Sequence, residues 1–600
     1  MNNETSTSGR AGIGHGSASR NVAIARLVIG LLQGLILWAL YRANEGVGGQ
    51  SVWPANVPTL FGPLVLISTY LPIVLLAGVG RLRLRTLAVW SVAAAVVLGL
   101  LALHDVVRAS NVTDAFGSFV ILPFSAAALF IAHHLIVPAD RERRWIAPYH
   151  AYFDTAWMAG VQLVLSIGFT GAFWLLLFLG AALFNVIGLS FLGDLITKPW
   201  FALPLTGLAF ATAVQLTDVR DGLIRGVRTV ALMLLSWLLL VLTVLVAGFL
   251  AALPFTGLTG LWETGSATAL VLSAAGALII LINTAYQDGR PDNLPPVVLR
   301  VAVRVASGLL TPLIVIAVWG LSLRIGQHGL TPDRIIACAC ALVGAAYAIG
   351  YGLAALVPLI RRGSTWMKAL EPTNIAVAVL TVGVILALFS PLADPARLSV
   401  ADQVKRLESG KVTINQFDFD FLRFDSGKAG LAALAKLSAS QDEAIAGQAR
   451  LAQRRSGPVL PRDAEVKDRV PIIEVWPAGS ELPKDFIVAV SLSDPRHGCK
   501  TTTDCLATAI DLDGDGAKEI LLANEYNVDL FVAGPDGAWR NEGSYRPLNC
   551  DREPKVEDPR AAMRAGRLRP IASRWPDLSF GDTPAQLNDN LRCLREDAAH

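Results

Sequence analysis

Long apolar segments alternate with short polar breaks as far as residue 390, and this pattern predicts a bundle of membrane-spanning helices. A helix needs about 20 consecutive apolar residues to cross the hydrocarbon core of a bilayer. Eleven segments meet this requirement, near residues 22–42, 59–79, 86–104, 118–137, 157–185, 199–216, 227–253, 267–286, 303–323, 335–359 and 373–390. The stretch 185–198 is expected to be interfacial or re-entrant. An odd number of crossings places the two ends of the chain on opposite sides of the membrane.

The segment that follows the last span is polar and roughly 210 residues long, a usual size for a domain. Short helices are predicted after Ser399, after Ser426 and from Ser440, the last with Glu443 in a capping-box pattern. Beyond residue 458 the predicted helices give way to predicted strands. Short β-branched or aromatic runs, bounded by Pro, Gly and Asp, predict strands at 470–475 and 486–491.

Composition supports the membrane class. Hydrophobic residues make up 53% of the 600-residue chain and charged residues only 16%, whereas soluble domains carry about 25% charged residues. The formal net charge of +3 is small for this length, so we expect no nucleic-acid partner.

The Lys and Arg residues orient the predicted spans, because cytoplasmic loops retain positive charge. Basic clusters follow the second, fourth, sixth, eighth and tenth spans, whereas the alternate loops are nearly bare. These clusters contain Arg81, Arg83, Arg85, Arg141, Arg143, Arg144, Arg220, Arg225, Arg228, Arg290, Arg300, Arg304, Arg361, Arg362 and Lys368. We therefore expect a cytoplasmic N-terminus and a C-terminal tail outside the cytoplasm.

The expected fold is an α-helical polytopic membrane bundle of about 11 spans followed by a C-terminal α+β extracytoplasmic domain. We expect a disordered cytoplasmic tail at 1–21, because this stretch is rich in Gly, Ser and Asn and lacks the order of a signal peptide. A transmembrane helical domain follows at 22–390, then a helical connecting region outside the membrane at 391–457. A small sheet-containing domain is expected at 458–600.

The polar groups in mid-span are neutral. Gln33, Gln162, Thr311 and Asn283 are expected to form hydrogen bonds between helices. Arg26 lies near the inner end of the first span, where its side chain is expected to reach the interface.

Two histidine-containing pairs fall in neighbouring spans. His104 and Asp105 end the third span on the outer side, whereas His133 and His134 lie near the inner end of the fourth. Most of the bilayer thickness separates the two pairs, so they are not expected to share a metal ion.

Four cysteines lie in the tail: Cys499, Cys505, Cys550 and Cys593. An even number in a compartment that permits disulfides predicts two bridges. Of the three connectivities that four cysteines allow, we prefer Cys499–Cys505 with Cys550–Cys593, because the first pair closes a short loop. Zinc binding is the alternative, although none of the spacings is Cys-x-x-Cys.

The sharpest chemical motif is Asp511-Leu-Asp-Gly-Asp-Gly-Ala-Lys-Glu519. Carboxylates at alternate positions can converge on one hard cation, and Gly516 permits a tight turn. An EF-hand needs an acid at its twelfth position, where Leu522 stands. The stretch instead resembles the calcium loops between two strands of integrin-like FG-GAP repeats. The expected ligands of a structural Ca²⁺ are Asp511, Asp513, Asp515, Glu519 and the carbonyl of Ala517. The alternative is an acidic hairpin turn that binds no metal.

Three stretches carry a family resemblance. They are Asn283-Thr-Ala-Tyr-Gln-Asp-Gly289, His328-Gly-Leu-Thr-Pro-Asp-Arg334 and Phe417-Asp-Phe-Asp-Phe-Leu-Arg-Phe-Asp-Ser-Gly427. The chain resembles an uncharacterised family of bacterial integral membrane proteins, the domain of unknown function 4153. The resemblance implies a bacterial inner-membrane protein with a periplasmic C-terminal part, and it implies no activity and no catalytic residues.

The same stretches also have a structural interpretation. Thr331 suits a helix N-cap with Pro332 at the first helical position. The alternation of Phe with acidic or polar residues over 417–424 predicts a half-buried strand, with its aromatic face in a core or against the membrane body.

These observations favour an envelope protein that binds, senses or scaffolds, and whose outer domain meets a periplasmic protein or other envelope component. Eleven spans exceed what an anchor needs, so a transporter of a small or lipid-like substrate is the alternative, with Gln33, Gln162 or Asn283 lining its path. An enzyme is disfavoured and no catalytic residue is predicted. The candidate groups, His104, Asp105 and the tail carboxylates, show no Ser-His-Asp or metal-ligand spacing.

Overall fold

The structure is a computed structural model, and its chain divides into two compact units, residues 1–457 and 458–600. Each unit is described by itself. The described residues are 8–46, 50–110, 120–257, 267–290, 292, 294–360, 366–454, 473–483, 485–487, 505–514, 516–524, 527–534, 539–545, 558–567, 578–580 and 583–585.

The first unit is a helical bundle, and within the described residues eleven of its helices are long and apolar enough to cross a membrane. They are α1 (Ser8–Glu45), α2 (Pro58–Gly78), α3 (Leu84–Arg108), α4 (Ile121–Glu142), α5 (Tyr149–Val186), α7 (Pro199–Val219), α8 (Asp221–Thr256), α10 (Ala267–Tyr286), α11 (Val297–His328), α12 (Pro332–Ile360) and α13 (Leu370–Leu388). The predicted fold class is confirmed, and the chain is a multi-pass membrane protein. Between α5 and α7, α6 (Phe191–Ile196) has six residues and is too short to cross.

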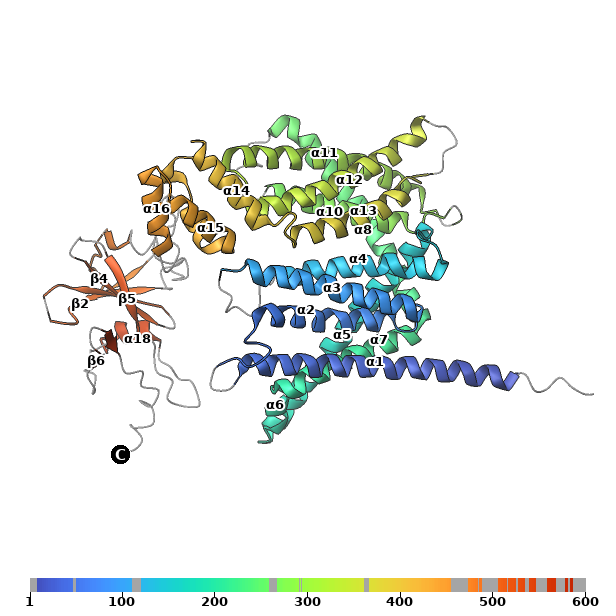
Figure 1. Ribbon diagram of the computed structural model, residues 1–600, viewed down its shortest axis with the longest axis horizontal. Coiled ribbons are helices and arrows are strands. Elements are labelled where there is room, and N and C mark those ends of the chain that lie inside the picture. The colour runs from blue at the N-terminus through green and yellow to red at the C-terminus, as the bar shows by residue number, and fades with distance from the viewer. Residues whose placement is uncertain are drawn as a thin grey trace, which may run out of the picture. The chain divides into compact units, whose positions relative to one another are not determined.

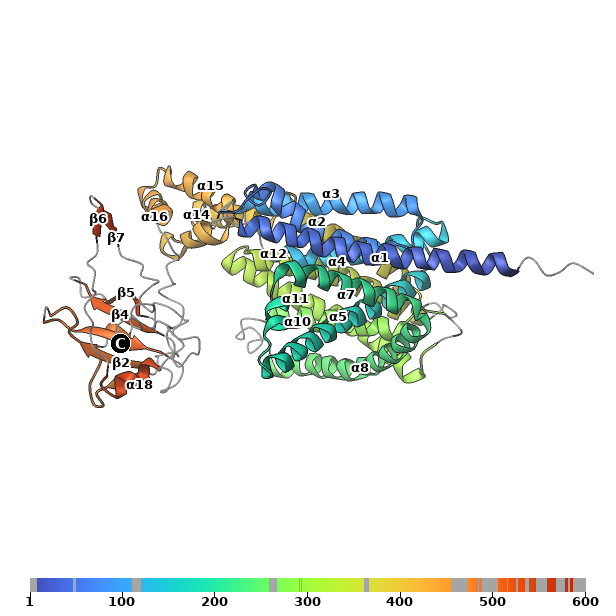
Figure 2. The same cartoon turned by 90° about the horizontal axis from the view of Figure 1, so that it is seen from below.

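The long helices lie side by side, and the start of α1 is at the opposite end of the bundle from the connector helices α14 (Pro395–Glu408), α15 (Gly427–Ser438) and α16 (Glu443–Arg454) (Figure 1). Figure 2 shows the same arrangement after a turn of 90°. α1 begins at Ser8, and residues 1–7 lie outside the described part of the chain, so the bounds of the N-terminal tail stay a prediction.

Close packing of α1 on α7 depends on glycine. A Cβ atom on Gly30 would lie 2.4 Å from the Gly207 carbonyl oxygen, and one on Gly207 would lie 2.2 Å from the Gly30 carbonyl oxygen. Membrane helices gain little from the hydrophobic effect among themselves, so small residues that let backbones approach stabilise such contacts.

The three connector helices confirm the predicted helical tail, and α15 begins directly after Ser426 as predicted, but the N-caps of the other two helices differ. Asp394 caps α14 by accepting from the backbone N–H of Ala396, so Ser399 lies inside the helix. Asp442, rather than Ser440, accepts from the N–H groups at the start of α16. A carboxylate next to the first helical residue competes well for these N–H groups because the helix dipole also favours it.

The strand predicted at Phe417–Phe424 is wrong. The segment follows a 3₁₀ turn, η1 (Ile414–Gln416), and its second half lies in a π-helical turn, η2 (Phe421–Asp425). The Asp418 carboxylate accepts from the Phe421 N–H at 2.8 Å, and such local bonds compete with sheet pairing. Phe417 and Phe419 are both buried in the connector core, with ring centroids 4.7 Å apart.

The second unit contains a five-stranded sheet of order β1-β2-β3-β4-β5. Its strands are β1 (Glu474–Trp476), β2 (Leu506–Ile510), β3 (Glu519–Ala523), β4 (Val528–Ala533) and β5 (Trp539–Tyr545). β1 pairs parallel with β2, and the other pairs are antiparallel. β3 is buried along its whole length, so the sheet has a core on each face. The unit also holds α18 (Pro559–Arg564) and the pair β6 (Leu578–Phe580) and β7 (Thr583–Ala585).

Of the two strands predicted for this unit, the first overlaps an observed strand and the second does not in its described part. β1 overlaps the segment predicted at 470–475, whose first three residues lie outside the described part of the chain. At 486–491 the prediction is wrong for its first two residues. Phe486 and Ile487 lie in a helical turn because their N–H groups both donate to the Pro483 carbonyl.

Helix α14 holds the turn between α11 and α12 through side-chain hydrogen bonds. Gln403 Nε2 donates to the carbonyls of His328 and Leu330, at 3.0 and 2.9 Å. The Leu330 N–H donates to Asp402 Oδ2 at 2.8 Å, and Ser399 Oγ donates to the Leu330 carbonyl at 2.8 Å. The last carbonyls of a helix lack partners within the helix, and α14 supplies them. We call this set of contacts the α14 clamp.

Arg406 completes the clamp by donating to the carbonyls of Gly326 and Gln327. The clamp closes around Gly329, the C-cap of α11, whose φ is 75° and ψ is −174°. A Cβ atom there would lie 2.7 Å from Gln403 Nε2 and 2.8 Å from Asp402 Oδ2. Glycine is therefore required both by its backbone conformation and by the approach of α14.

We expect Gly329→Ala to destabilise the protein by about 1–3 kcal/mol, because the backbone conformation is strained for a residue with a Cβ atom. The clamp must also shift to admit the methyl group. The measurement is the thermal unfolding midpoint of the detergent-purified protein. Gly326→Ala is the matched control, since a Cβ atom there meets nothing within 4 Å. Equal midpoints for the two variants would contradict the expectation.

Candidate functional site

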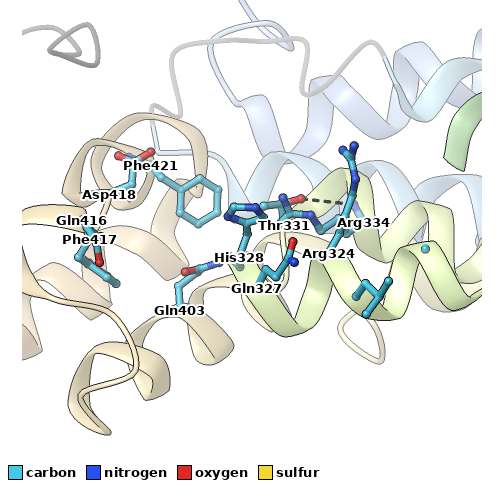
Figure 3. A pocket seen from close by; sticks show the side chains of 12 residues that line it. Arg324, Gln327, His328, Thr331, Arg334, Gln403, Gln416, Phe417, Asp418 and Phe421 are labelled. Atoms are coloured by element: carbon cyan, nitrogen blue, oxygen red, sulfur yellow. Dashed lines mark hydrogen bonds between the residues drawn. The ribbon is translucent and has the colours of Figure 1, made fainter. Parts of the chain in front are cut away.

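A cavity of about 700 Å³ lies between the ends of α11 and α12 and the connector (Figure 3). We call it the α11–α12 pocket. Its lining residues come from α11, from the following turn and the start of α12, from α14 and from the segment around η1 and η2. They are Gly320, Leu323, Arg324, Gln327, His328, Thr331, Arg334, Gln403, Gln416, Phe417, Asp418 and Phe421. Figure 3 shows Asp418 and Phe421 on the connector side, facing His328 on the bundle side.

The bundle side of the pocket is cationic. Arg324 and Arg334 line it, and Arg406 of the clamp lies close enough to act on Arg334 as a repelling charge. Arg334 Nη1 donates to the Gly329 carbonyl at 2.7 Å, which fixes the guanidinium relative to the clamp. Among the lining residues that the structure describes, Asp418 is the one carboxylate.

Further acids lie on the connector next to the pocket. Burial raises the pKa of Asp425, and the neighbouring carboxylates of Asp418 and Asp420 raise it further. Asp420 and Asp425 do not line the pocket, whose charged lining residues are Arg324, Arg334, His328 when protonated, and Asp418.

Two stretches with conspicuous sequences meet at this pocket. His328–Arg334 contributes His328, Thr331 and Arg334, and 417–427 contributes Phe417, Asp418 and Phe421. Sequence analysis did not predict that they meet. A helical turn in place of the expected strand is what brings Asp418 and Phe421 to the same wall. The available signal was the density of polar and aromatic residues in both stretches.

The third stretch contributes to a polar network inside the bundle. Asn283 Nδ2 donates to Tyr351 Oη, Tyr351 Oη donates to Asn374 Oδ1, and Asn374 Nδ2 donates to Asn283 Oδ1, each at 2.7 Å. Tyr149 Oη joins at 3.2 Å from Asn374 Nδ2. This closed ring links α5, α10, α12 and α13, and a cavity of about 240 Å³ lies beside it.

The interhelical hydrogen bonds expected of the other mid-span polar groups are confirmed. Gln33 Nε2 donates to the Thr69 carbonyl at 2.9 Å, and Gln162 Nε2 donates to the Val214 carbonyl at 3.1 Å. Thr311 forms a longer bond, 3.4 Å, to the Ala348 carbonyl.

The expectation that Arg26 reaches the interface is wrong. Its side chain is 1% exposed and forms an ion pair with Asp218 at 2.7 Å and a hydrogen bond with Gln215 at 2.8 Å. Arg81 also pairs with Asp218 and donates to Gln162. A buried guanidinium needs such partners because burial removes its hydration. The α1 sequence alone does not indicate them, since they lie on α7.

The two histidine pairs have separate partners. His104 Nε2 lies 3.4 Å from Asp394, and Asp105 accepts from Arg108 at 2.7 Å. His133 Nδ1 accepts from Trp90 Nε1 at 3.1 Å. The described chain therefore gives these histidines structural neighbours at distinct places.

The acidic loop joins β2 to β3, which are paired as an antiparallel hairpin. Carboxylate oxygens of Asp511, Asp513 and Glu519 lie within 4.8 Å of one another. Asp511 accepts from the N–H groups of Gly514 and Gly516, at 2.7 and 3.1 Å. Oxygen ligands grouped in this way fit a hard divalent cation.

The other predicted site residues of this unit are placed less fully. Ala517 lies in the same loop, and Asp515 falls outside the described residues. Cys505 is buried just before β2. Cys499, Cys550 and Cys593 lie outside the described residues, so the two disulfides stay a prediction.

Comparison with known proteins places the chain in a family without adding an activity. No curated protein and no solved structure matches it. A family model described as a domain of unknown function, DUF4153, matches residues 64–437. The match runs from within α2 to the last turns of α15, so it contains the whole α11–α12 pocket and the Asn283 ring. The chain therefore belongs to the DUF4153 family.

Proposed function

We propose that this membrane protein acts in the bacterial envelope as a binding, sensory or scaffolding protein. In this proposal it lies in the inner membrane with a cytoplasmic N-terminus. Its C-terminal unit is periplasmic and meets a periplasmic protein or another envelope component. The observation that carries the proposal is the α11–α12 pocket, whose walls come from the bundle on one side and from the connector on the other.

The clamp supports a sensory role for this pocket. Gln403 both lines the pocket and donates to two carbonyls of the turn, so an occupant of the pocket touches the contacts that hold the connector. The connector leads directly into the C-terminal unit along the chain. Binding at the pocket is thereby linked to the segment that carries the partner-binding unit.

Ion pairs between loops support the proposed orientation. Arg83, between α2 and α3, pairs with Asp140 at the end of α4 at 2.6 Å. Arg81, from the same loop, pairs with Asp218 at the end of α7. Three of the basic loops therefore meet at one end of the bundle, as the retention of positive charge in the cytoplasm requires.

Transport is the second candidate, favoured by the small cavity that Asn283 lines. It is the weaker candidate because Asn283 and Asn374 are hydrogen-bonded to each other and to Tyr351. Gln33 and Gln162 are likewise engaged between helices. Groups that are satisfied in this way stabilise the bundle and are less available to a passing substrate.

The proposed orientation is tested by reporter fusions. Alkaline phosphatase fused after His600 should be active, because that enzyme works only after export. A phosphatase fusion after Arg83, at the end of the loop between α2 and α3, should be inactive. Green fluorescent protein should be fluorescent when fused after Arg83 and not fluorescent when fused after His600. Activity confined to the fusion after Arg83 would overturn the orientation and with it the periplasmic C-terminal unit.

The proposed Ca²⁺ site is tested by the stability of the full-length protein in detergent. At a free calcium concentration of about 100 Kd the native state should gain about 2.7 kcal/mol relative to calcium-free buffer. Asp513→Ala should remove this gain, because it deletes one oxygen ligand of the group. Glu481→Gln, an exposed change in the same unit, is the control and should keep it. If calcium does not change the unfolding midpoint of the wild-type protein, the loop is an acidic hairpin turn that binds no metal.

A further inference from the structure

We propose that the α11–α12 pocket binds an anionic phosphate group that carries an apolar substituent. This proposal rests on the proposed binding function and names the ligand class of the same site. Two sources share this chemistry: a phospholipid headgroup of the surrounding bilayer and a soluble phosphate compound.

The first argument is charge. Arg324 and Arg334 line one cavity; Arg324 and Arg406 act on Arg334 as repelling like charges, and Asp333 acts on it as an attracting charge. Guanidiniums hold their charge at any physiological pH, so the cavity presents two permanent cations to a bound anion. Asp418 supplies a single negative charge on the opposite wall.

The second argument is the geometry of the donors. The guanidinium is a planar fork with five N–H donors, and it matches the oxygens of a phosphate. Arg334 is held in place through Nη1, which donates to the Gly329 carbonyl. The remaining lining adds uncharged donors from Gln327 and Thr331. Such a wall can contact several oxygens of one group at once.

The third argument is depth and size. The lining residues of α11 and α12 lie in the last turns of one span and the first turn of the next, which is the level of lipid headgroups. Phosphates are the usual anions at that level. Leu323, Phe417 and Phe421 give the cavity an apolar part, and about 700 Å³ exceeds the needs of a single phosphate ion.

The test titrates full-length protein in a neutral maltoside detergent with three probes: pyrophosphate, dioctanoyl phosphatidylglycerol and dioctanoyl phosphatidylcholine. Binding is followed by microscale thermophoresis. We expect the net-anionic lipid or pyrophosphate, or both, to bind more tightly than the zwitterionic lipid. Binding of the anionic lipid alone identifies a headgroup, and binding of pyrophosphate alone identifies a soluble source.

Charge variants locate the binding. Arg324→Gln and Arg334→Gln should each raise Kd about tenfold or more, since each removes a charge-assisted hydrogen bond. Asp418→Asn should lower Kd severalfold, because it removes the opposing charge and keeps an oxygen that can accept from the Phe421 N–H. A gain of affinity cannot arise from misfolding. Arg42→Gln is the control, an exposed arginine at the end of α1.

Two outcomes overturn the proposal: no preference for anionic over zwitterionic probes, and unchanged affinity in all three pocket variants. Neither outcome is confused with failure of the proposed orientation, because binding in detergent does not depend on which side the pocket faces. Phosphate binding with a cytoplasmic C-terminus would keep this inference and reject the envelope orientation. Fusion results that agree with the proposed orientation, together with no phosphate binding, would keep the envelope orientation and reject this inference.

Discussion

The α14 clamp is the constraint on which the arrangement of the non-membrane part of the first unit depends. The last carbonyls of a helix have no partners within the helix. Here the side chains of Gln403 and Arg406 supply those partners, and Ser399 bonds the Leu330 carbonyl of the following turn. A tight turn alone would leave α14 free to move. The hydrogen bonds instead make the connector part of the same compact unit as the bundle.

The same requirement explains the interior of the bundle. Polar side chains between membrane helices must bond to each other or to carbonyls, since lipid offers no substitute. The Asn283 ring does this with neutral groups, and Arg26 does it with the carboxylate of Asp218. Burial of the Arg26–Asp218 pair requires more free energy than burial of the neutral ring, because two ions lose their hydration. Each ion therefore needs its partner, and this requirement restricts which helices can pack together. Together these contacts fix the pairing of helices whose apolar surfaces are alike.

Sequence analysis succeeds where one local property decides the structure. Apolar length determines the eleven spans, and the acidic motif, which resembles loops between two strands, anticipates the β2–β3 hairpin. It fails where two partners compete for one group. Asp394 outcompetes Ser399 as a cap, and Asp418 bonds the Phe421 N–H and so replaces a strand by a helical turn. The burial of Arg26 and the meeting of His328 with Phe421 depend on residues far apart in the chain, which no local pattern encodes.

The pocket and the clamp share atoms, and this sharing sets what a ligand can do. The Gly329 carbonyl accepts from Arg334, a pocket residue, and the N–H of the same peptide group, that of Leu330, donates to Asp402 of α14. The Leu330 carbonyl accepts from Gln403 of α14. A group that draws the Arg334 guanidinium toward itself competes with the Gly329 carbonyl. A ligand group that accepts a hydrogen bond from Gln403 competes with the His328 and Leu330 carbonyls of the turn. A ligand can shift the connector only by the difference in its affinity for the clamped and the released states. Because the clamp consists of several hydrogen bonds of about 0.5–1.5 kcal/mol each, a ligand that replaces one or two of them loosens the connector without releasing it.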